Sequence, residues 1–273
     1  MPFVFDGARF ATLKLLVAED NLNNQKVIRL LLQRLGIEPD CVADGRQAVA
    51  AARTKAYDII ILDLHMPVMD GLEASREIRA LKLAKQPLMV ALTANAFQED
   101  HDAAVAAGMD EYLTKPITLT RLRQLLAKLT QAIHGPPEPI VRHHPPEPAP
   151  ADPPEALPLI DAHQLETLAD LGRADYLDVL SELIREVPVY LADIRTFIAA
   201  GDAPALKRRV HSFRGGLACF GCVAMTSRLA PLEAPEIVPP AQAAPVQAEL
   251  QALWERSLVA IKEWEKSVAS FNS

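Results

Sequence analysis

The sequence lacks the features that mark membrane-spanning, secreted and disulfide-bonded proteins. It has no window of the roughly 18 unbroken apolar residues that a membrane span needs. Its first residues, M-P-F-V-F-D-G, lack the basic segment and apolar core of a secretory signal. The only three cysteines, Cys41, Cys219 and Cys222, cannot all pair with one another. We therefore expect a cytoplasmic protein that has no membrane insertion and no disulfide scaffold.

An excess of positive charge is also missing. The formal net charge is −7, and a surface of that sign does not attract nucleic acid or an anionic membrane. Half of the 273 residues are hydrophobic, so cores can be buried, and the length suits two domains. We expect no nucleic-acid partner.

The stretch from 59 to 71, I-I-I-L-D-L-H-M-P-V-M-D-G, is the most informative part of the chain. Its apolar run leads directly into Asp63 and is followed by turn residues, which is typical of a buried strand in a parallel sheet. Ligands bind beyond the carboxyl ends of such strands. A lone aspartate at a strand end often only caps the next turn, so other residues must decide its role.

Short apolar strands alternate with amphipathic helices over the first 130 or so residues. The predicted strands are 15–18, 37–42, 59–62, 88–92 and 111–113, and the predicted helices are 21–36, 45–54, 72–81, 98–107 and 119–129. Five successive βα units predict an α/β fold with a flavodoxin-like, doubly wound, five-stranded parallel sheet.

Polar residues follow four of these strands: Glu19 and Asp20, Asp63, Thr93, and Lys115. Carboxyl ends of parallel strands meet at one edge, so we expect these side chains to lie together. Three carboxylates repel one another unless they share a cation, and oxygen ligands with open positions suit Mg²⁺. Asp63 would then be a nucleophile toward phosphorus, with Lys115 and Thr93 facing the phosphoryl oxygens. The backbone carbonyl of His65 is a further candidate ligand.

Four motifs in this region resemble a response-regulator receiver domain over about residues 12–132. They are E-D-N at 19–21, D-L-H-M-P-V-M-D-G at 63–71, A-L-T-A at 91–94 and K-P at 115–116. The resemblance implies that Asp63 accepts a phosphoryl group from phosphohistidine and that Glu19 and Asp20 help to hold Mg²⁺. It also implies that Thr93 and Lys115 sense the phosphoryl group.

Tyr112 is implied by the same resemblance to be an aromatic switch that reorients on activation. A half-buried tyrosine on the last strand is an equally good interpretation, because such residues are ordinary in sheets.

Residues 133–158 are predicted to be a linker, because ten prolines lie between 136 and 158. Proline removes backbone donors and favours an extended chain, so 136–158 would span at most roughly 70 Å. No thiolate or carboxylate spacing accompanies His134, His143 and His144, which argues against a metal site there.

The second half, residues 159–269, is predicted to be an all-α four-helix bundle. Apolar residues recur at spacings of three and four along 161–171, 176–200, 203 to about 229, and 246–268. Within the third helix stands H-S-F-R-G-G-L-A-C-F-G-C, which begins at His211.

A helical wheel divides this third helix into two faces. One face is core and carries Val210, Phe213, Leu217, Phe220 and Ala224; the other is predicted to face solvent and carries His211, Gly215, Ala218 and Cys222. Glycine within a helix costs up to about 1 kcal/mol relative to alanine, which is understandable if a partner must approach closely. We therefore expect a docking face at Gly215 and Ala218.

Arg214 lies one turn beyond His211 and is placed to donate to an anion held on that histidine. A lone helical histidine is more commonly an ordinary surface residue, but glycines around it favour a functional role. The C-x-x-C at 219–222 leaves redox or metal chemistry open. Cys222 would lie about 16 Å along the helix from His211, too far to share an ion, and Cys219 fits a small filler better.

The H-x-x-R-G segment resembles a histidine-containing phosphotransfer domain, covering roughly 159–269. Gly216 stands where a small polar residue commonly occurs in that family, and the proline-rich break at 231–245 is longer than expected. The resemblance implies that His211 carries a phosphoryl group to or from a receiver aspartate.

The two resemblances together predict a two-domain phosphorelay protein with Mg²⁺ as cofactor. Its partners would be a sensor histidine kinase and other receiver or phosphotransfer proteins. One alternative is the C-terminal part of a hybrid sensor histidine kinase, although these residues show no glycine-rich ATP lid or dimerising histidine helix. Another is a module that sequesters a partner without phosphorylation. These residues would be a phosphotransfer module without an ATP-binding kinase domain, and would belong to a histidine kinase only as part of a longer hybrid chain.

Overall fold

A computed structural model describes residues 10–93, 98–134, 157–233 and 238–268, and the chain forms two compact units. Ala94 of the A-L-T-A motif, His143, His144 and most of the proline-rich linker lie outside the described residues, as does the side chain of His134. Each unit is described by itself below.

The first unit contains the predicted five-stranded parallel sheet, in the order β2-β1-β3-β4-β5. Its strands are β1 (Leu15–Ala18), β2 (Asp40–Val42), β3 (Ile59–Asp63), β4 (Leu88–Thr93) and β5 (Glu111–Thr114). Every residue of β1 and β3 is buried, which agrees with their uninterrupted apolar sequences.

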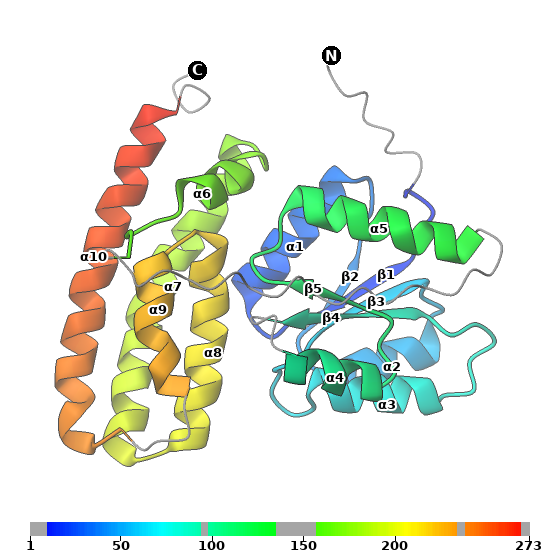
Figure 1. Cartoon of the computed structure of the whole chain (residues 1–273), viewed down its shortest axis with the longest axis horizontal. Helices are drawn as coiled ribbons and strands as arrows, with labels where there is room; N and C mark the ends of the chain where they lie inside the picture. The colour runs from blue at the N-terminus through cyan, green and yellow to red at the C-terminus, as the bar shows by residue number, and fades with distance from the viewer. Residues whose placement is uncertain (1–9, 94–97, 135–156, 234–237, 269–273) are drawn as a thin grey trace. The chain divides into compact units, whose positions relative to one another are not determined.

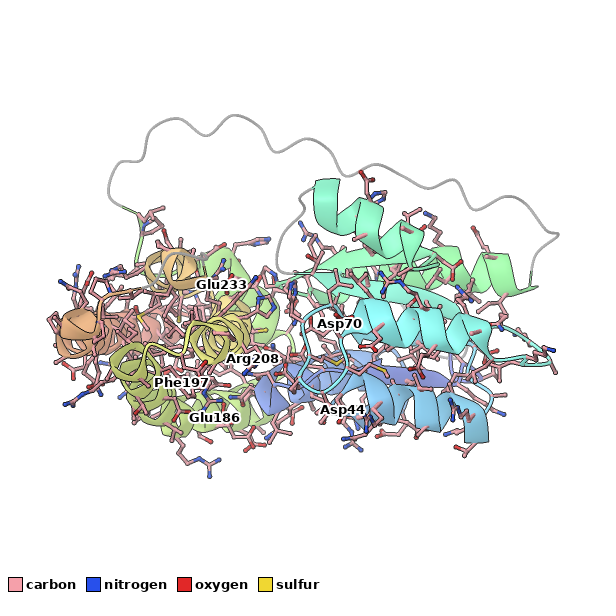
Figure 2. All side chains as sticks on the ribbon, turned by 90° about the horizontal axis from the view of Figure 1, so that it is seen from below. Asp44, Asp70, Glu186, Phe197, Arg208 and Glu233 are labelled. Atoms are coloured by element: carbon pink, nitrogen blue, oxygen red, sulfur yellow. The ribbon has the colours of Figure 1, made fainter. Side chains whose placement is uncertain are left out.

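Helices cover both faces of this sheet, as Figure 1 shows. One face carries α1 (Leu22–Arg34) and α5 (Leu119–His134), and the other carries α2 (Gly45–Thr54), α3 (Gly71–Ala80) and α4 (Gln98–Ala106). The side chains of Asn21, Asp44 and Asp70 cap α1, α2 and α3 by accepting backbone N–H bonds. Asp44 and Asp70 are labelled in Figure 2.

Strand β2 is three residues shorter at its start than predicted, and the first of these residues, Ile37, belongs to the hydrogen-bonded turn that ends α1. Gly36 has a φ of 81°, and its N–H donates to Gln33 O, while the N–H of Ile37 donates to Leu32 O. This pair of bonds is the Schellman motif. Ile37 is therefore buried as part of the end of the helix rather than the strand.

The second unit is helical, as predicted. It contains α6 (Ala162–Ala169), α7 (Arg173–Ala200), α8 (Ala203–Cys219), α9 (Val223–Leu229), the short 3-10 helices η2 (Ala230–Glu233) and η3 (Pro240–Gln242), and α10 (Ala243–Ser267). Helix α7 packs on α8 and α10, and α9 packs on α8 and α10 (Figure 1). Tyr176 lies in this core, with ring centroids of Phe220 and Trp264 each 6.1 Å away.

The prediction of one long third helix is wrong, because the structure has two helices there. α8 ends at Cys219, and Gly221, with a φ of 60°, turns the chain into α9. The turn is held by Asp161, whose N–H donates to Gly221 O at 2.7 Å, and a Cβ on Gly221 would lie 2.7 Å from Asp161 O. Cys222 is consequently buried at the start of α9 and does not share a helical stripe with His211.

Candidate functional site

Three carboxylates meet at the carboxyl edge of the sheet. Glu19 and Asp20 follow β1, and Asp63 ends β3. One ligand oxygen from each of the three lies within 4.8 Å of the others. Glu19 and Asp63 are almost fully buried, with relative exposures of 0% and 1%. The topology therefore gathers the acidic residues that the sequence placed at strand ends.

Lys115 is the cation of this cluster. Its Nζ lies 2.6 Å from Asp63 Oδ2 and 2.8 Å from Glu19 Oε2, and it reaches them from the end of β5. The other oxygen of Asp63 accepts from the backbone N–H of His65 at 3.1 Å. Glu19 is fixed from α1, because Asn24 Nδ2 donates to its Oε1 at 2.9 Å. Asn24 was not predicted as a site residue.

The charges of this cluster are unbalanced. Burial raises the pKa of Glu19, Lys115 lowers it and Asp63 raises it again, with a net value of about 8. Burial lowers the pKa of Lys115, but Asp63 and Glu19 outweigh burial and raise that pKa above its ordinary value. Lys115 thus pairs with two of three clustered carboxyl groups, and a cluster with more carboxyl groups than cations offers oxygen donors that fit a hard divalent cation.

Gly71 lets the loop after β3 return against the strand. A Cβ at this position would lie 2.2 Å from the carbonyl oxygen of Asp63. The N–H of Gly71 also donates to Leu64 O at 3.3 Å. The glycine of the D-G pair is therefore required for a close backbone approach beside the candidate nucleophile.

Val68, in the same loop, has a φ of 69° and a side chain that is 70% exposed. A β-branched residue in the left-handed region is strained by about 1–2 kcal/mol. We expect Val68→Gly to raise the free energy of unfolding of this unit by about 1 kcal/mol, since glycine's greater freedom in the unfolded chain offsets part of the relief. Hydrogen exchange of the β3 amides measures the change. Val68→Ala, which keeps a Cβ, should gain less; equal or lower stability in Val68→Gly would contradict the assignment of strain.

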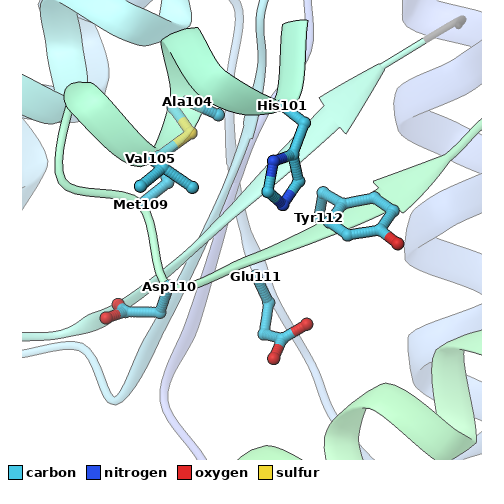
Figure 3. A pocket seen from close by; sticks show the side chains of 7 residues that line it. All are labelled: His101, Ala104, Val105, Met109, Asp110, Glu111 and Tyr112. Carbon is cyan, nitrogen blue, oxygen red and sulfur yellow. The ribbon is translucent and has the colours of Figure 1, made fainter. Parts of the chain in front are cut away.

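Thr93 and Tyr112 lie on the neighbouring strands β4 and β5. Thr93 is buried at the end of β4, and its carbonyl accepts from the backbone N–H of Lys115 at 2.8 Å. The Tyr112 ring is half-buried and meets the His101 ring edge to face, with centroids 5.4 Å apart (Figure 3). Burial raises the pKa of Tyr112. His101, on α4, was not predicted to be a neighbour of this tyrosine.

In the second unit, His211 and Arg214 lie one turn apart on α8 and share a carboxylate. Glu233, at the end of η2, places Oε1 3.5 Å from His211 Nδ1 and Oε2 2.6 Å from Arg214 Nη1. Burial raises the pKa of Glu233, but His211 and Arg214 outweigh burial and hold that pKa below its usual value. Glu233 is labelled in Figure 2.

Sequence reasoning missed Glu233 because it lies in the proline-rich segment that we interpreted only as a break between helices. No local pattern connects it with His211, 22 positions earlier. Only the packing of η2 on α8 brings the two together.

The remaining residues singled out on α8 are placed as follows. Gly215 is buried and Ala218 is half-buried. That these two residues form a docking face for a partner protein stays a prediction. Cys219 and Cys222 are buried and form no disulfide. Burial raises the pKa of Cys222 to about 12, so its sulfur is a thiol rather than a reactive thiolate at neutral pH.

Comparison with protein families divides the chain in the same way. The family of response regulator receiver domains matches residues 15–127, and the Hpt domain family matches residues 178–264. Sensor protein GacS of Pseudomonas syringae pv. syringae is 32% identical over 212 residues, which are 74% of this chain and 22% of GacS. Sensor histidine kinase GacS of Pseudomonas protegens is 34% identical over 207 residues, which are again 74% of this chain and 22% of that protein. The chain thus spans about a fifth of the length of these relatives.

Two solved structures are similar to a part of this chain. The receiver domain of sensor histidine kinase PA1611 from Pseudomonas aeruginosa PAO1, described with a magnesium ion coordinated in its active site cleft, is 42% identical. It has a TM-score of 0.41 and covers 43% of this chain and 97% of its own. Chemotaxis protein CheY4 of Vibrio cholerae is 31% identical, with a TM-score of 0.42, and covers 44% of this chain and 99% of its own.

A search of the described residues found no helix that is both long enough and apolar enough to span a membrane.

Proposed function

Because this chain belongs to the two-component phosphorelay proteins, with a response regulator receiver domain followed by an Hpt domain, we propose that Asp63 and His211 are its two phosphoacceptors. The phosphoryl group would pass between them directly or through partner proteins. The observation that carries the proposal is the pairing of Asp63 with Lys115 at 2.6 Å inside a cluster of three carboxylates. The proposed domains extend from 12 to 132 and from 159 to 269, with a linker at 133–158.

The receiver residues have separate roles in an in-line displacement. Catalysis of such a reaction is mostly positioning of the reactants and neutralisation of charge. An oxygen of Asp63 attacks phosphorus as the bond from phosphorus to the donor imidazole breaks. Lys115 and the Thr93 hydroxyl stabilise the phosphoryl oxygens. Thr93 and Tyr112 would form the switch that responds to phosphorylation.

Glu19, Asp20, Asp63 and the backbone carbonyl of His65 would hold Mg²⁺, which would supply further neutralisation of the phosphoryl oxygens. The excess of carboxylates over cations in this cluster supports that assignment. In the Hpt domain, Gly215 and Ala218 would form the face on which a receiver docks.

The proposed partners are a sensor histidine kinase and other receiver or phosphotransfer proteins, in the cytoplasm and without nucleic acid. Incubation with a phosphorylated histidine kinase should label the chain at both sites. Asp63→Asn should remove the acid-stable, base-labile label of an acyl phosphate, and His211→Gln should remove the acid-labile label of phosphohistidine. A label of either kind that survives its own substitution would contradict the assignment of that residue.

A second candidate is that these residues are part of a hybrid sensor histidine kinase. The observation that favours it is the match of 74% of this chain to two proteins named as GacS sensors. Incubation of the purified chain with ATP and Mg²⁺ separates kinase activity from relay activity. We expect no self-phosphorylation of these 273 residues, and labelling by ATP alone would overturn the assignment of a phosphotransfer module.

A further inference from the structure

Two aromatic rings pack against each other where α4 meets β5. The centroids of the His101 and Tyr112 rings lie 5.4 Å apart and their planes meet at 84°, which is the edge-to-face arrangement that aromatic pairs prefer. Only 12% of the His101 side chain is exposed. Both rings line a small hollow together with Val105 and Met109, as Figure 3 shows. The surrounding packing therefore keeps the two rings in contact.

The end of α4 that leads into β5 is fixed by side chains from α3. Ser75 Oγ donates to Ala107 O at 2.8 Å, and Arg79 Nε donates to Gly108 O at 2.8 Å. Ser75 is fully buried, so its bond is shielded from water. His101 thus lies on a helix whose C-terminal end is anchored, and it gives the tyrosine ring a firm surface to pack on.

The contact with His101 belongs to one rotamer of Tyr112. Side chains occupy discrete staggered wells, and a change of χ1 from one well to another moves a tyrosine ring by several ångströms. A ring displaced by that distance no longer meets His101. In the structure Lys115 Nζ donates directly to Asp63 Oδ2 at 2.6 Å, which is the arrangement of the unmodified carboxylate. The pair of rings is therefore formed in the unphosphorylated receiver domain.

Tyr112 and Thr93 lie on the same face of the sheet. Ala91 on β4 pairs with Tyr112 on β5, and Thr93 comes two residues after Ala91, where the alternation along a strand returns to the same face. α4 covers that face, because Tyr112 packs against the hydrophobic cluster that includes Ala91 and Ala104. A change of rotamer that takes the Tyr112 ring toward Thr93 therefore gives up the contact with His101.

We propose that His101 is a positioning residue that holds Tyr112 in its unphosphorylated rotamer and so sets how readily the receiver domain switches. The proposal rests on the proposed function, in which Thr93 and Tyr112 respond to phosphorylation of Asp63. A contact shifts an equilibrium between two forms only when it differs between them. The pair of rings meets that condition, because only one rotamer of Tyr112 can form it.

The size of the effect follows from the geometry of the pair. An edge-to-face aromatic pair changes an equilibrium constant by roughly 2- to 12-fold. Loss of the His101 ring should shift the rotamer equilibrium of Tyr112 by that factor. Coupling between two sites is reciprocal, so the same loss should tighten the binding of a phosphoryl analogue at Asp63 by up to the same factor.

The rotamer of Tyr112 can be measured by NMR of the full chain with labelled tyrosine, through the three-bond couplings that report χ1. The chain has four tyrosines, and the Tyr112 signals are those lost in Tyr112→Phe. We expect the rotamer that meets His101 to predominate in the wild-type chain. His101→Ala should shift the χ1 populations by roughly 2- to 12-fold, whereas His101→Phe, which keeps an aromatic ring, should leave them near wild type.

The response to the phosphoryl site is measured by titration with beryllium fluoride in the presence of Mg²⁺, as an analogue of the phosphoryl group on Asp63. His101→Ala should bind it roughly 2- to 12-fold more tightly than the wild-type chain, and His101→Phe should bind it like wild type. The control is His163→Ala, which removes an exposed histidine paired with Glu166 in the Hpt domain and should change neither property.

The two proposals fail in different ways. Beryllium fluoride binding that survives in Asp63→Asn would contradict the proposed function, whereas the χ1 couplings are measured without the analogue. Wild-type χ1 populations and wild-type affinity in His101→Ala would overturn the role of His101, and so would equal changes in His101→Ala and His101→Phe. If exchange of the β3 amides shows that His101→Ala unfolds the receiver domain, His101→Leu takes its place. This variant fills the hollow without a ring, and wild-type χ1 populations in it would overturn the role.

Discussion

Gly71→Ala is expected to lower the free energy of unfolding of the receiver domain by about 3 kcal/mol. The new Cβ would lie 2.2 Å from the carbonyl oxygen of Asp63 and 2.9 Å from its carbonyl carbon. These are backbone atoms, so no rotamer change relieves the contact. Overpacking of this kind costs about 1–3 kcal/mol or more, and loss of the bond from Gly71 N–H to Leu64 O adds about 1 kcal/mol.

Hydrogen exchange of the β3 and β4 amides measures this loss in the receiver domain alone. Both tryptophans lie in α10, so fluorescence reports the Hpt domain and should be unchanged. Gly201→Ala, which lies in the Hpt domain and is measured by tryptophan fluorescence, is a useful control, because its Cβ meets nothing within 4 Å and its φ of 67° costs alanine only about 1–2 kcal/mol. A loss at Gly71 no larger than at Gly201 would show that the loop has room to move.

Lys115→Ala is the second substitution with a large expected effect. It leaves Asp63 and Glu19 buried and facing one another without their ammonium, and breaking a buried ion pair typically costs about 3–5 kcal/mol. We expect that loss in the receiver domain in EDTA. Mg²⁺ should restore part of it, because a divalent cation bound to the folded form neutralises the same carboxylates.

The matched control is Lys55→Ala, which breaks an exposed ion pair with Asp40 in the same domain and should cost less than about 1 kcal/mol. Exchange of the β3 amides with and without Mg²⁺ gives the measurement for both variants. Stability of Lys115→Ala equal to wild type in EDTA, or indifferent to Mg²⁺, would contradict our account of the carboxylate cluster.

Local patterns were sufficient for most of the fold. The apolar run before Asp63 predicted β3, because this signal acts over a few residues. Two boundaries were wrong, the first for a local reason and the second for a tertiary one. Ile37 joins the end of α1 through its bond to Leu32 O, and Gly221 ends α8 because Asp161 binds there.

For the candidate site, too, some contacts could be predicted from the sequence and others could not. The topology of a parallel sheet was enough to bring Lys115 to Asp63 across 52 positions of sequence. It could not predict that Asn24 holds Glu19, that His101 packs on Tyr112, or that Glu233 reaches His211. Each of these contacts depends on how a helix packs, and neither composition nor spacing encodes that.

The most direct test of the central claim is phosphoryl labelling of the Asp63→Asn, His211→Gln double variant by a phosphorylated histidine kinase that labels the wild-type chain. The account predicts that His211→Gln keeps the acyl-phosphate label, that Asp63→Asn keeps a phosphohistidine label only when a phosphorylated receiver is added as donor, and that the double variant keeps none. The folding controls are fluorescence from α10 and exchange of the β3 amides. Label retained by a folded double variant would contradict the account.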